Sequence, residues 1–365
     1  MPNVLLVILN RVLKRVKKIP SKLKELVYGC TLSKIYSPRE EISAEDLEAT
    51  DLRHIHLCGN NYYVARVPDG KIYTNRVSNV SVISEKYVIG NVSWQFKNND
   101  NSLVYGADEL PGFPKYIRSE LASLLTGGGG NNNYYHWMVD SLPRLYLINS
   151  LFPEHNKRKY YIPEYTTNYQ RETLRMRGID EADVISSKDS KYISTRCCYA
   201  TSHPNPNNDV PEWIISFLRR SFVKSTKNKQ NKRIYISRKD SVNKRNIVNE
   251  EELRGRLEKI GFESYRLSSL SIQEQANLFN KASVVVGVHG AGLTNLVFSQ
   301  ANTRVIEIFS NNYSPKMYKN ISQKIGASYQ SINCQPVGGT GSERKKNIKI
   351  RKEDIEKINY MVESS

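Results

Sequence analysis

The residues best suited to chemistry lie in the segment 283–295, which reads SVVVGVHGAGLTN. Its first four residues predict a strand that is buried on both faces, and a helical pattern begins at Leu293. Between them lie His289 and three glycines, at positions 287, 290 and 292. Glycine allows the backbone to approach a ligand closely, and the first N–H groups of a helix attract anions. The segment therefore predicts a phosphate site, with a tight structural turn as the alternative.

The spacing of these glycines separates the segment from two familiar nucleotide-binding loops. It reads G-x-x-G-x-G, which is neither the dinucleotide fingerprint G-x-G-x-x-G nor the Walker loop G-x-x-x-x-G-K-[ST]. Glu307 lies further along the chain, inside the apolar run RVIEIF. A carboxylate in a buried strand is unfavourable unless it is paired or used in binding, so Glu307 is a further candidate.

A second group of candidate residues lies in the segment 133–144, which reads NYYHWMVDSLPR. On a helix, His136, Asp140 and Arg144 would share one face, because they are four residues apart. A carboxylate beside an imidazole orients the ring and raises its basicity, so the first two form a candidate general-base pair. The alternative is a buried structural pair in which Arg144 neutralises Asp140. Pro143 interrupts the helix and could turn Asp140 towards a cleft.

A third group comprises Arg238 and Arg245, in the segment 233–249 that reads RIYISRKDSVNKRNIVN. They are expected at the end of a strand and in the loop that follows it. Arginine in such a place suits a planar, bidentate grip on a diphosphate. The alternative is that both belong to a basic, solvated surface.

The net charge of +18 is concentrated in three runs that contain no acidic residue, 1–24, 219–233 and 344–352. These runs hold 20 of the 54 basic residues, which leaves 34 basic against 36 acidic residues in the rest of the chain. The body of the protein is therefore close to neutral. Basic ends and linkers suit anionic surfaces, either lipid or nucleic acid, and the alternative is ordinary solvated lysine.

Residues 1–45 are predicted to form a basic amphipathic helical segment, broken near Pro20. Its apolar start is too short to span a membrane, and no cleavage site follows. We expect residues 1–28 to lie on an anionic membrane surface or to pack on protein. The five cysteines are odd in number and fit no zinc pattern, which indicates a reducing compartment. A cytoplasmic location, with the N-terminal helix on the inner face of the membrane, follows as an expectation.

The order of predicted elements indicates an α/β fold. From Lys232 onward strands alternate with helices that begin at the caps Asn249 and Ser271, and the strands are expected at 233–237, 262–267, 284–286 and 305–309. This alternation predicts a parallel, Rossmann-like sheet whose ligands bind beyond the carboxyl ends of the strands. The first half is predicted to contain β-hairpins over 55–67 and 71–94, strands at 121–126, 159–163, 184–185 and 192–199, and helices from 134 and over 169–177.

Taken in order, the three groups resemble glycosyltransferase family 61, whose bacterial members are often labelled capsular polysaccharide biosynthesis proteins. The resemblance covers roughly residues 121–309 and rests on NYYHWMVDSLPRL, on RIYISR followed by KRNIVNE, and on GVHGAGLTN with VIEIF. It implies the GT-B architecture, in which two Rossmann-like domains face each other across a cleft. It also implies an inverting transfer from a nucleotide sugar, expected to be UDP-linked, to a hydroxyl of a glycan or lipid-linked acceptor.

The resemblance, together with the connection predicted at 202–209, sets the expected domains. These are the helical segment 1–45, an acceptor-side domain 46–209 that carries His136 and Asp140, a nucleotide-sugar-binding domain 210–342, and a helix over 343–365 that packs back on the body.

The resemblance also implies roles for the candidate residues. The base is His136, oriented by Asp140, or Asp140 itself, with support from Asn133 and Arg144. The donor-binding residues are Arg238, Arg245, His289, Gly290, Ala291, Gly292, Leu293, Thr294, Asn295 and Glu307. Glu307 would accept the ribose hydroxyls, or would be a buried structural carboxylate. Because arginines and helix N–H groups can replace a divalent ion beside a diphosphate, we expect neither a metal nor a cofactor.

Two other functions account for part of the sequence. A non-catalytic scaffold that binds sugar nucleotides within a polysaccharide assembly complex would have the same fold. A nucleic-acid-binding protein would use the basic runs. The near-neutral body and the lack of an RNA-reading or helix-turn-helix motif argue against that second function, so no nucleic-acid partner is expected.

Overall fold

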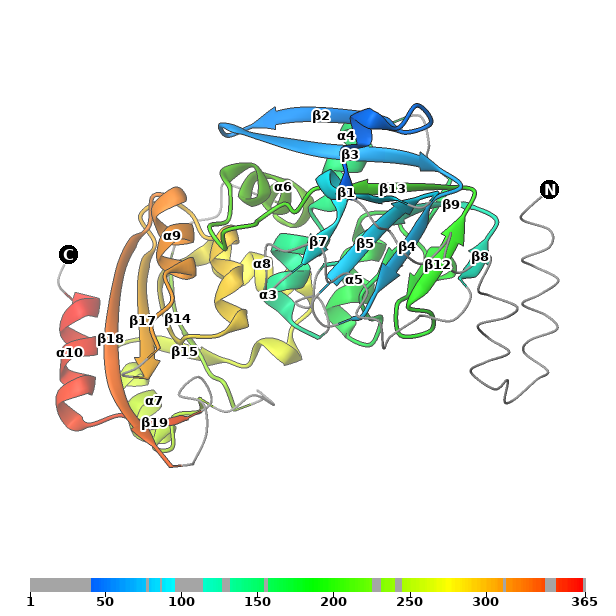
Figure 1. Cartoon of the computed structure of the whole chain (residues 1–365). Helices are drawn as coiled ribbons and strands as arrows, with labels where there is room; N and C mark the ends of the chain where they lie inside the picture. The colour runs from blue at the N-terminus through cyan, green and yellow to red at the C-terminus, as the bar shows by residue number, and fades with distance from the viewer. Residues whose placement is uncertain are drawn as a thin grey trace, which may run out of the picture. The chain divides into compact units, whose positions relative to one another are not determined.

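The computed structural model describes residues 41–76, 79–85, 87–95, 114–126, 132–153, 157–224, 231–239, 245–310, 313–338 and 346–363. Residues 1–40 of the predicted N-terminal helical segment and glycines 127–130 lie outside the described residues. The end of that segment, predicted as helical to residue 45, forms the strand β1 (Glu41–Ile42) and the start of the 3₁₀ helix η1 (Ala44–Asp46) instead. The chain divides into two compact units, residues 1–204 (unit 1) and 205–365 (unit 2), whose elements are labelled in Figure 1. The boundary falls inside the stretch 202–209 that the sequence predicts as a connection.

Unit 1 contains two sheets whose inner faces share one core. The first sheet holds β1 (Glu41–Ile42), β4 (Lys71–Thr74), β5 (Asn79–Ser84), β6 (Tyr87–Ile89), β7 (Trp94–Gln95), β8 (Lys115–Ile117) and β12 (Tyr192–Thr195). The second holds β2 (Asp51–Leu57), β3 (Asn60–Pro68), β9 (Glu120–Ser123), β10 (Arg158–Ile162), β11 (Val184–Ser186) and β13 (Cys197–Thr201). Buried side chains from both sheets, such as Ile72 on β4 and Leu121 on β9, belong to one hydrophobic cluster.

The second sheet of unit 1 has a parallel half with a topological switch point. Its order is β11-β10-β9-β13-β3-β2, and the first four strands run parallel. The order reverses between β9 and β13, which is where open α/β sheets bind ligands. The chain that follows β9 forms α3 (Tyr134–His136), η4 (Trp137–Ser141) and α4 (Arg144–Leu151), while α5 (Asn168–Met176) and η5 (Glu181–Asp183) connect β10 to β11. The strand before His136 is therefore the one at which the order reverses.

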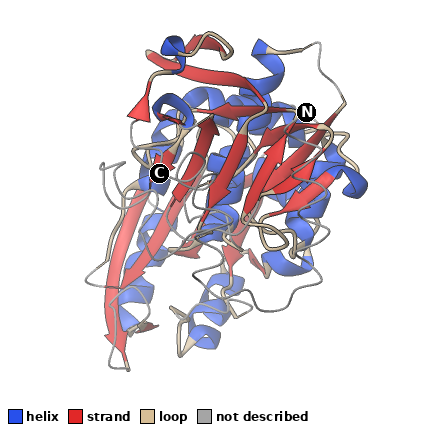
Figure 2. Ribbon diagram, turned by 45° about the vertical axis from the view of Figure 1, so that its right-hand side comes forward, coloured by secondary structure: helices blue, strands red, loops and turns tan. Residues whose placement is uncertain are grey.

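Unit 2 is built on one sheet of order β15-β14-β16-β17-β18-β19, parallel except at β19. The strands are β14 (Lys232–Ile236), β15 (Phe262–Tyr265), β16 (Ala282–Val288), β17 (Arg304–Ser310), β18 (Ser328–Val337) and β19 (Asn347–Lys349). The helices are α6 (Glu212–Phe222), α7 (Glu250–Lys259), η6 (Leu267–Ser269), α8 (Ile272–Lys281), η7 (Ala291–Phe298), α9 (Met317–Lys324) and α10 (Lys352–Glu363). Figure 2 shows helices lying against the strands. Here the order reverses between β14 and β16, so this is the second switch point of the chain.

Local chemistry explains why these residues form these elements. The strands β16 and β17 are buried along almost their whole length, and β16 is almost wholly apolar, as is typical of central parallel strands. A capping box starts α8, because the Ser271 amide donates to Glu274 Oε2 at 2.8 Å and the Glu274 amide donates back to the Ser271 hydroxyl at 3.3 Å. The α10 helix places Ile355, Ile358 and Val362 in the same core cluster as the central strands. The predicted α/β class with a Rossmann-like parallel sheet is confirmed.

Two local predictions differ from the structure. The predicted strand 192–199 is two strands, β12 and β13, which belong to different sheets. The segment after Val288 is the 3₁₀ helix η7, not an α-helix.

The hairpins predicted over 55–67 and 71–94 are present as the antiparallel pairs β2–β3 and β4–β5. The β2–β3 hairpin turns at Cys58 and Gly59, both of which are left-handed (φ 50° and 79°). Between the hairpins, the chain at Pro68–Gly70 crosses from β3 in one sheet to β4 in the other, and a Cβ at Gly70 would lie 2.5 Å from Cys198 Sγ.

The parallel core of unit 2 makes a stability prediction. Ile308 on β17 has no exposed surface, so Ile308→Ala leaves a cavity and is expected to lower the local free energy of unfolding by about 2–5 kcal/mol. Hydrogen exchange of the β16 and β17 amides, followed by mass spectrometry, measures this loss. Val248→Ala is the control, because Val248 is 54% exposed and its loss is expected to change exchange little. Equal exchange in the two variants would contradict the packing described here.

Candidate functional site

In unit 2 the residues that follow β14 and β16 meet at the switch point. The Arg238 guanidinium, two residues beyond β14, lies directly against Gly290, two residues beyond β16. A Cβ built on Gly290 would lie 1.5 Å from Arg238 Nη1, so any side chain at 290 would displace the guanidinium. The glycine is therefore needed for close approach and not for its backbone angles, since its φ of 175° is open to any residue.

Arg245 and His289 extend this group. Arg245 is held in a left-handed conformation (φ 82°), and its guanidinium lies 5.8 Å from the centre of the Tyr313 ring. The same tyrosine ring is 5.5 Å from the His289 ring, at a steep angle. The structure thus brings together Arg238, Arg245 and His289, which the sequence places 51 residues apart at most. Two guanidinium groups at a switch point give a cationic site of the kind that a diphosphate requires.

His289 is fixed by a buried carboxylate. Its Nδ1 lies 2.5 Å from Glu307 Oε1, and the Tyr329 hydroxyl donates to Glu307 Oε2 at 2.7 Å. Burial lowers the pKa of His289; the bond to Glu307 opposes that effect, and the charges of Arg245 and Arg238 add to it. The ring is consequently neutral at physiological pH, with its hydrogen on Nδ1 and its lone pair on Nε2.

Several predicted donor-binding residues lie in the interior instead. Thr294, Asn295 and Glu307 have no exposed surface, and Leu293 is 2% exposed. The Leu293 amide donates to the Gly290 carbonyl at 2.9 Å, so it is not available to a ligand. Asn295 donates to Gln275 Oε1 at 2.8 Å. These four side chains are corrected to core positions; for Glu307 this is the structural alternative that the sequence left open. Of the predicted turn, half-buried Ala291 and Gly292 retain exposed surface beside buried Gly290.

In unit 1 the His136–Asp140 pair forms as predicted. His136 Nδ1 lies 2.5 Å from Asp140 Oδ2, and the side chains are 17% and 4% exposed. The bond places the hydrogen on Nδ1 and the lone pair on Nε2. Because the carboxylate is buried while the ring keeps exposed surface, the imidazole is the member of the pair that a substrate can reach.

The helix that carries the pair is not a regular α-helix. Trp137–Ser141 forms a π-helical turn, in which the Leu142 amide donates to the Trp137 carbonyl at 2.9 Å. The following Pro143 lacks an N–H group and cannot continue an α-helical ladder, which accounts for the interruption. Pro143 therefore does not turn Asp140 outwards, contrary to one interpretation of the sequence.

Arg144 and Asn133 support this segment from its two ends. Arg144 donates through Nε to the Asp140 carbonyl at 3.0 Å and through Nη1 to the carbonyl and hydroxyl of Thr201, both at 2.9 Å. Complete burial lowers the pKa of Arg144 to about 10, and the charge of Asp140 opposes that shift. Asn133 caps α3, since its Oδ1 accepts the Tyr135 amide at 3.1 Å. Both predicted supporting residues therefore position the main chain around His136 and Asp140.

Sequence reasoning missed the aromatic residues that surround His289. Phe309 stacks on its ring at 5.2 Å, and Tyr318 lies 5.2 Å away on α9. Tyr313 completes the set, and Tyr329 donates to the carboxylate of Glu307 that holds the ring. The signal available was the run NNYSP that follows β17, at the same edge of the sheet as His289.

The described ranges hold no group of three or more His, Cys, Asp and Glu side chains placed to bind a metal ion. Within the same ranges, no helix combines the length and the apolar character needed to cross a membrane.

Comparison with known proteins gives a match over a region that contains His136, Asp140, Arg238, Arg245 and His289. The sequence model of the family described as Glycosyltransferase 61 matches residues 134–306. A stretch of 64 residues is 41% identical to "Beta-1,2-xylosyltransferase RCN11" of Oryza sativa subsp. japonica, and 67 residues are 33% identical to "Beta-1,2-xylosyltransferase" of Arabidopsis thaliana. Each stretch covers 18% of this chain and 12% of the relative, so the chain matches about an eighth of these curated relatives.

The lowered pKa of His289 predicts a pH dependence of stability. The unfolded chain takes up a proton near pH 6.5, whereas the buried ring takes it up only at a lower pH. The stabilising contribution is therefore present above pH 6.5 and is lost as the pH falls below it. We expect the decrease in melting temperature between pH 7.5 and pH 5.5 to be smaller in His289→Gln than in the wild type. His56→Gln, on exposed β2, is the control and should decrease as the wild type does; an equal decrease in His289→Gln would contradict the assignment.

Proposed function

We propose, because the model of the family described as Glycosyltransferase 61 matches residues 134–306, that the chain transfers a sugar from a nucleotide sugar to an acceptor hydroxyl with inversion at the anomeric carbon. The observation that carries the proposal is the short His136 Nδ1–Asp140 Oδ2 bond, which leaves the lone pair of a partly exposed imidazole on Nε2. That is the state which a general base requires.

The proposed reaction is a single displacement. His136 Nε2 removes the proton from the acceptor hydroxyl as its oxygen attacks the anomeric carbon. The bond from that carbon to the diphosphate oxygen breaks on the opposite face, and the electron pair leaves with the diphosphate. Buried Asp140 stabilises the imidazolium that forms, because the charge of the carboxylate lies 2.5 Å from the ring nitrogen.

The residues proposed to bind the nucleotide-sugar donor belong to unit 2. Arg238 and Arg245 would neutralise the charge that develops on the leaving diphosphate, which is the role that a divalent ion plays in other transferases. The turn Gly290–Gly292 provides main chain at the same switch point, where Arg238 already packs on Gly290. We propose that His289 faces this site as a neutral ring, held by Glu307, rather than as a third cation.

The names of the matched relatives suggest the first donor to test. Both are β-1,2-xylosyltransferases, and a β product from an α-linked nucleotide sugar requires inversion, so we propose UDP-xylose as the first candidate donor. The proposal includes the GT-B architecture, which the two units and the parallel strands in each support. It also includes a role in cell-surface polysaccharide synthesis in the cytoplasm, at a membrane that residues 1–28 would bind.

The base assignment is tested by His136→Ala. Loss of a general base is expected to lower kcat by about 100- to 10,000-fold while the affinity for donor is retained, because the imidazole acts on the acceptor. Radiolabelled sugar transfer measures kcat, and calorimetry measures donor affinity. His56→Ala, an exposed histidine on β2, is the matched control and should keep full activity. Wild-type turnover in His136→Ala would remove this residue from the mechanism.

The diphosphate site is tested by Gly290→Ala. The added methyl group must displace the Arg238 guanidinium, so affinity for UDP is expected to fall about tenfold or more, as when a charged hydrogen bond is lost. Gly255→Ala is the control, because a Cβ at that position on α7 meets no atom within 4 Å. Calorimetric titration of UDP into both variants gives the comparison. Unchanged affinity in Gly290→Ala would place the donor elsewhere.

A further inference from the structure

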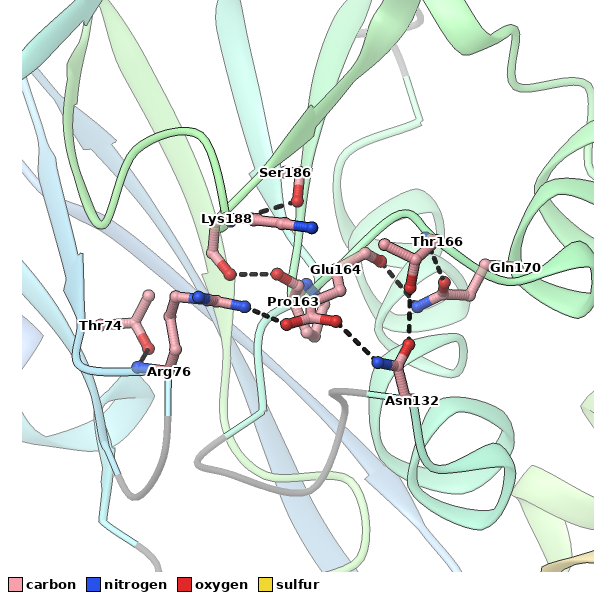
Figure 3. A network of polar contacts seen from close by, with 10 residues as sticks. Thr74, Arg76, Asn132, Pro163, Glu164, Thr166, Gln170, Ser186 and Lys188 are labelled. Carbon is pink, nitrogen blue, oxygen red and sulfur yellow. Dashed lines mark hydrogen bonds and ion pairs between the residues drawn. The ribbon is translucent and has the colours of Figure 1, made fainter. Parts of the chain in front are cut away.

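A polar network surrounds Glu164, just beyond the carboxyl end of β10 in unit 1 (Figure 3). Its Oε1 accepts a hydrogen bond from Arg76 Nη2, and its Oε2 accepts one from Asn132 Nδ2 at 2.9 Å. The Thr166 hydroxyl donates to the other side of the Asn132 amide, at 2.6 Å from Oδ1. The Asn132 side chain is thus held at both of its polar atoms by the chain that follows β10.

Asn132 stands at the entry to the segment that carries His136. It has a left-handed backbone (φ 53°), which a residue with a side chain adopts only at a cost and which the network around it stabilises. The next residue, Asn133, caps α3, and His136 follows three positions later. The direction in which the chain enters α3 is therefore set at Asn132.

The main chain of Glu164 belongs to a rigid frame. The carbonyl of Glu164 accepts Gln170 Nε2 at 2.6 Å, and Gln170, which has no exposed surface, completes the capping box that starts α5. The same helix holds the His136 segment at two further points. The ring of Tyr169 lies 5.2 Å from that of Tyr134, and the Thr173 hydroxyl accepts Trp137 Nε1 at 2.9 Å.

These contacts fall on both sides of the candidate base. Tyr134 and Asn132 precede His136, and Trp137 follows it. Neither the three-residue α3 nor the π-helical turn forms a continuous α-helical ladder, so the contacts with α5 and with the chain after β10 add to the His136–Asp140 bond in holding the ring. A misplacement of about 1 Å in a reacting group can cost about 100-fold in rate, so such a segment depends on external contacts.

We infer that Glu164 is a positioning residue for the transfer reaction, which it serves by holding Asn132 and thereby the His136–Asp140 pair. Arg76 supports it by occupying Oε1, which leaves Oε2 directed at Asn132. The role in catalysis rests on the proposed function of His136, whereas the effect on the position of the ring does not.

The experiment uses the polarity of the Asn132–Glu164 bond in the full-length protein. Asn132→Asp replaces the donor by a carboxylate that faces the Glu164 carboxylate, so it is expected to lower kcat about tenfold with little change in the KM for donor. Adding Glu164→Gln restores an N–H···O bond with the opposite polarity and is expected to bring kcat back to within about threefold of the wild type. Asn132→Gly keeps the left-handed backbone but removes the side chain, and is expected to lower kcat as Asn132→Asp does.

The second readout is independent of activity. The ring resonances of His136, assigned by their loss in His136→Gln, report the bond to Asp140 by NMR. They are expected to move in Asn132→Asp and to return in the double variant. Asp183→Asn is the matched control, because it removes the ion pair between Asp183 and Lys159 of β10, the strand that precedes Glu164. This variant should leave both kcat and the His136 resonances unchanged.

The outcomes separate the two proposals. Unmoved His136 resonances in Asn132→Asp, full activity in Asn132→Gly, or no recovery in the double variant would overturn the positioning role. Moved and restored resonances together with an active His136→Ala would uphold the positioning role and overturn only the assignment of the base.

Discussion

The geometry of both candidate groups of residues depends on one constraint: a carboxylate that is buried inside a protein must have a hydrogen-bonding partner. Asp140 in unit 1 and Glu307 in unit 2 each meet it with the Nδ1 atom of a histidine at 2.5 Å. The bond does more than give a buried carboxylate a hydrogen-bond donor, because it fixes the tautomer and leaves the lone pair of each ring on Nε2. The two pairs differ in exposure: His136 keeps 17% of its side-chain surface, whereas His289 keeps 6%. The more exposed ring, that of His136, suits proton transfer. The more enclosed ring, that of His289, suits a fixed part of the lining of a binding site.

The position of each pair follows from topology. His136 follows β9, where the strand order of unit 1 reverses, and His289 follows β16, where the order of unit 2 reverses. At such a point the crossover connections leave in opposite directions and open space above the strand ends. Two pairs of the same chemistry therefore occupy equivalent places in two sheets of different strand order, and the one in unit 2 lies beside two arginines.

Much of the fold and part of the candidate site could be predicted from the sequence, because these features depend on short-range patterns. The buried strand before Gly287, the Ser271 cap and the four-residue spacing of His136 and Asp140 are all local signals, and the structure contains each of them. The predictions that were wrong, and the contacts that were missed, depend on residues that are distant in the sequence. Leu293, Thr294 and Asn295 read as a ligand-facing turn, yet they pack into the core of unit 2. Asn132 and Glu164, which bond to each other, lie 32 residues apart in the sequence, and no periodicity connects them.

Burial is the main reason why His289 is neutral, because it lowers the pKa of the ring. The bond to Glu307 opposes that shift, and the charges of Arg245 and Arg238 act in the same direction as burial. A protonated ring there would repel the two guanidinium groups and would add a proton-dependent charge to the site. A neutral ring leaves the positive charge to groups that stay ionised at every physiological pH. A diphosphate bound at this switch point would then meet a charge that does not vary with pH.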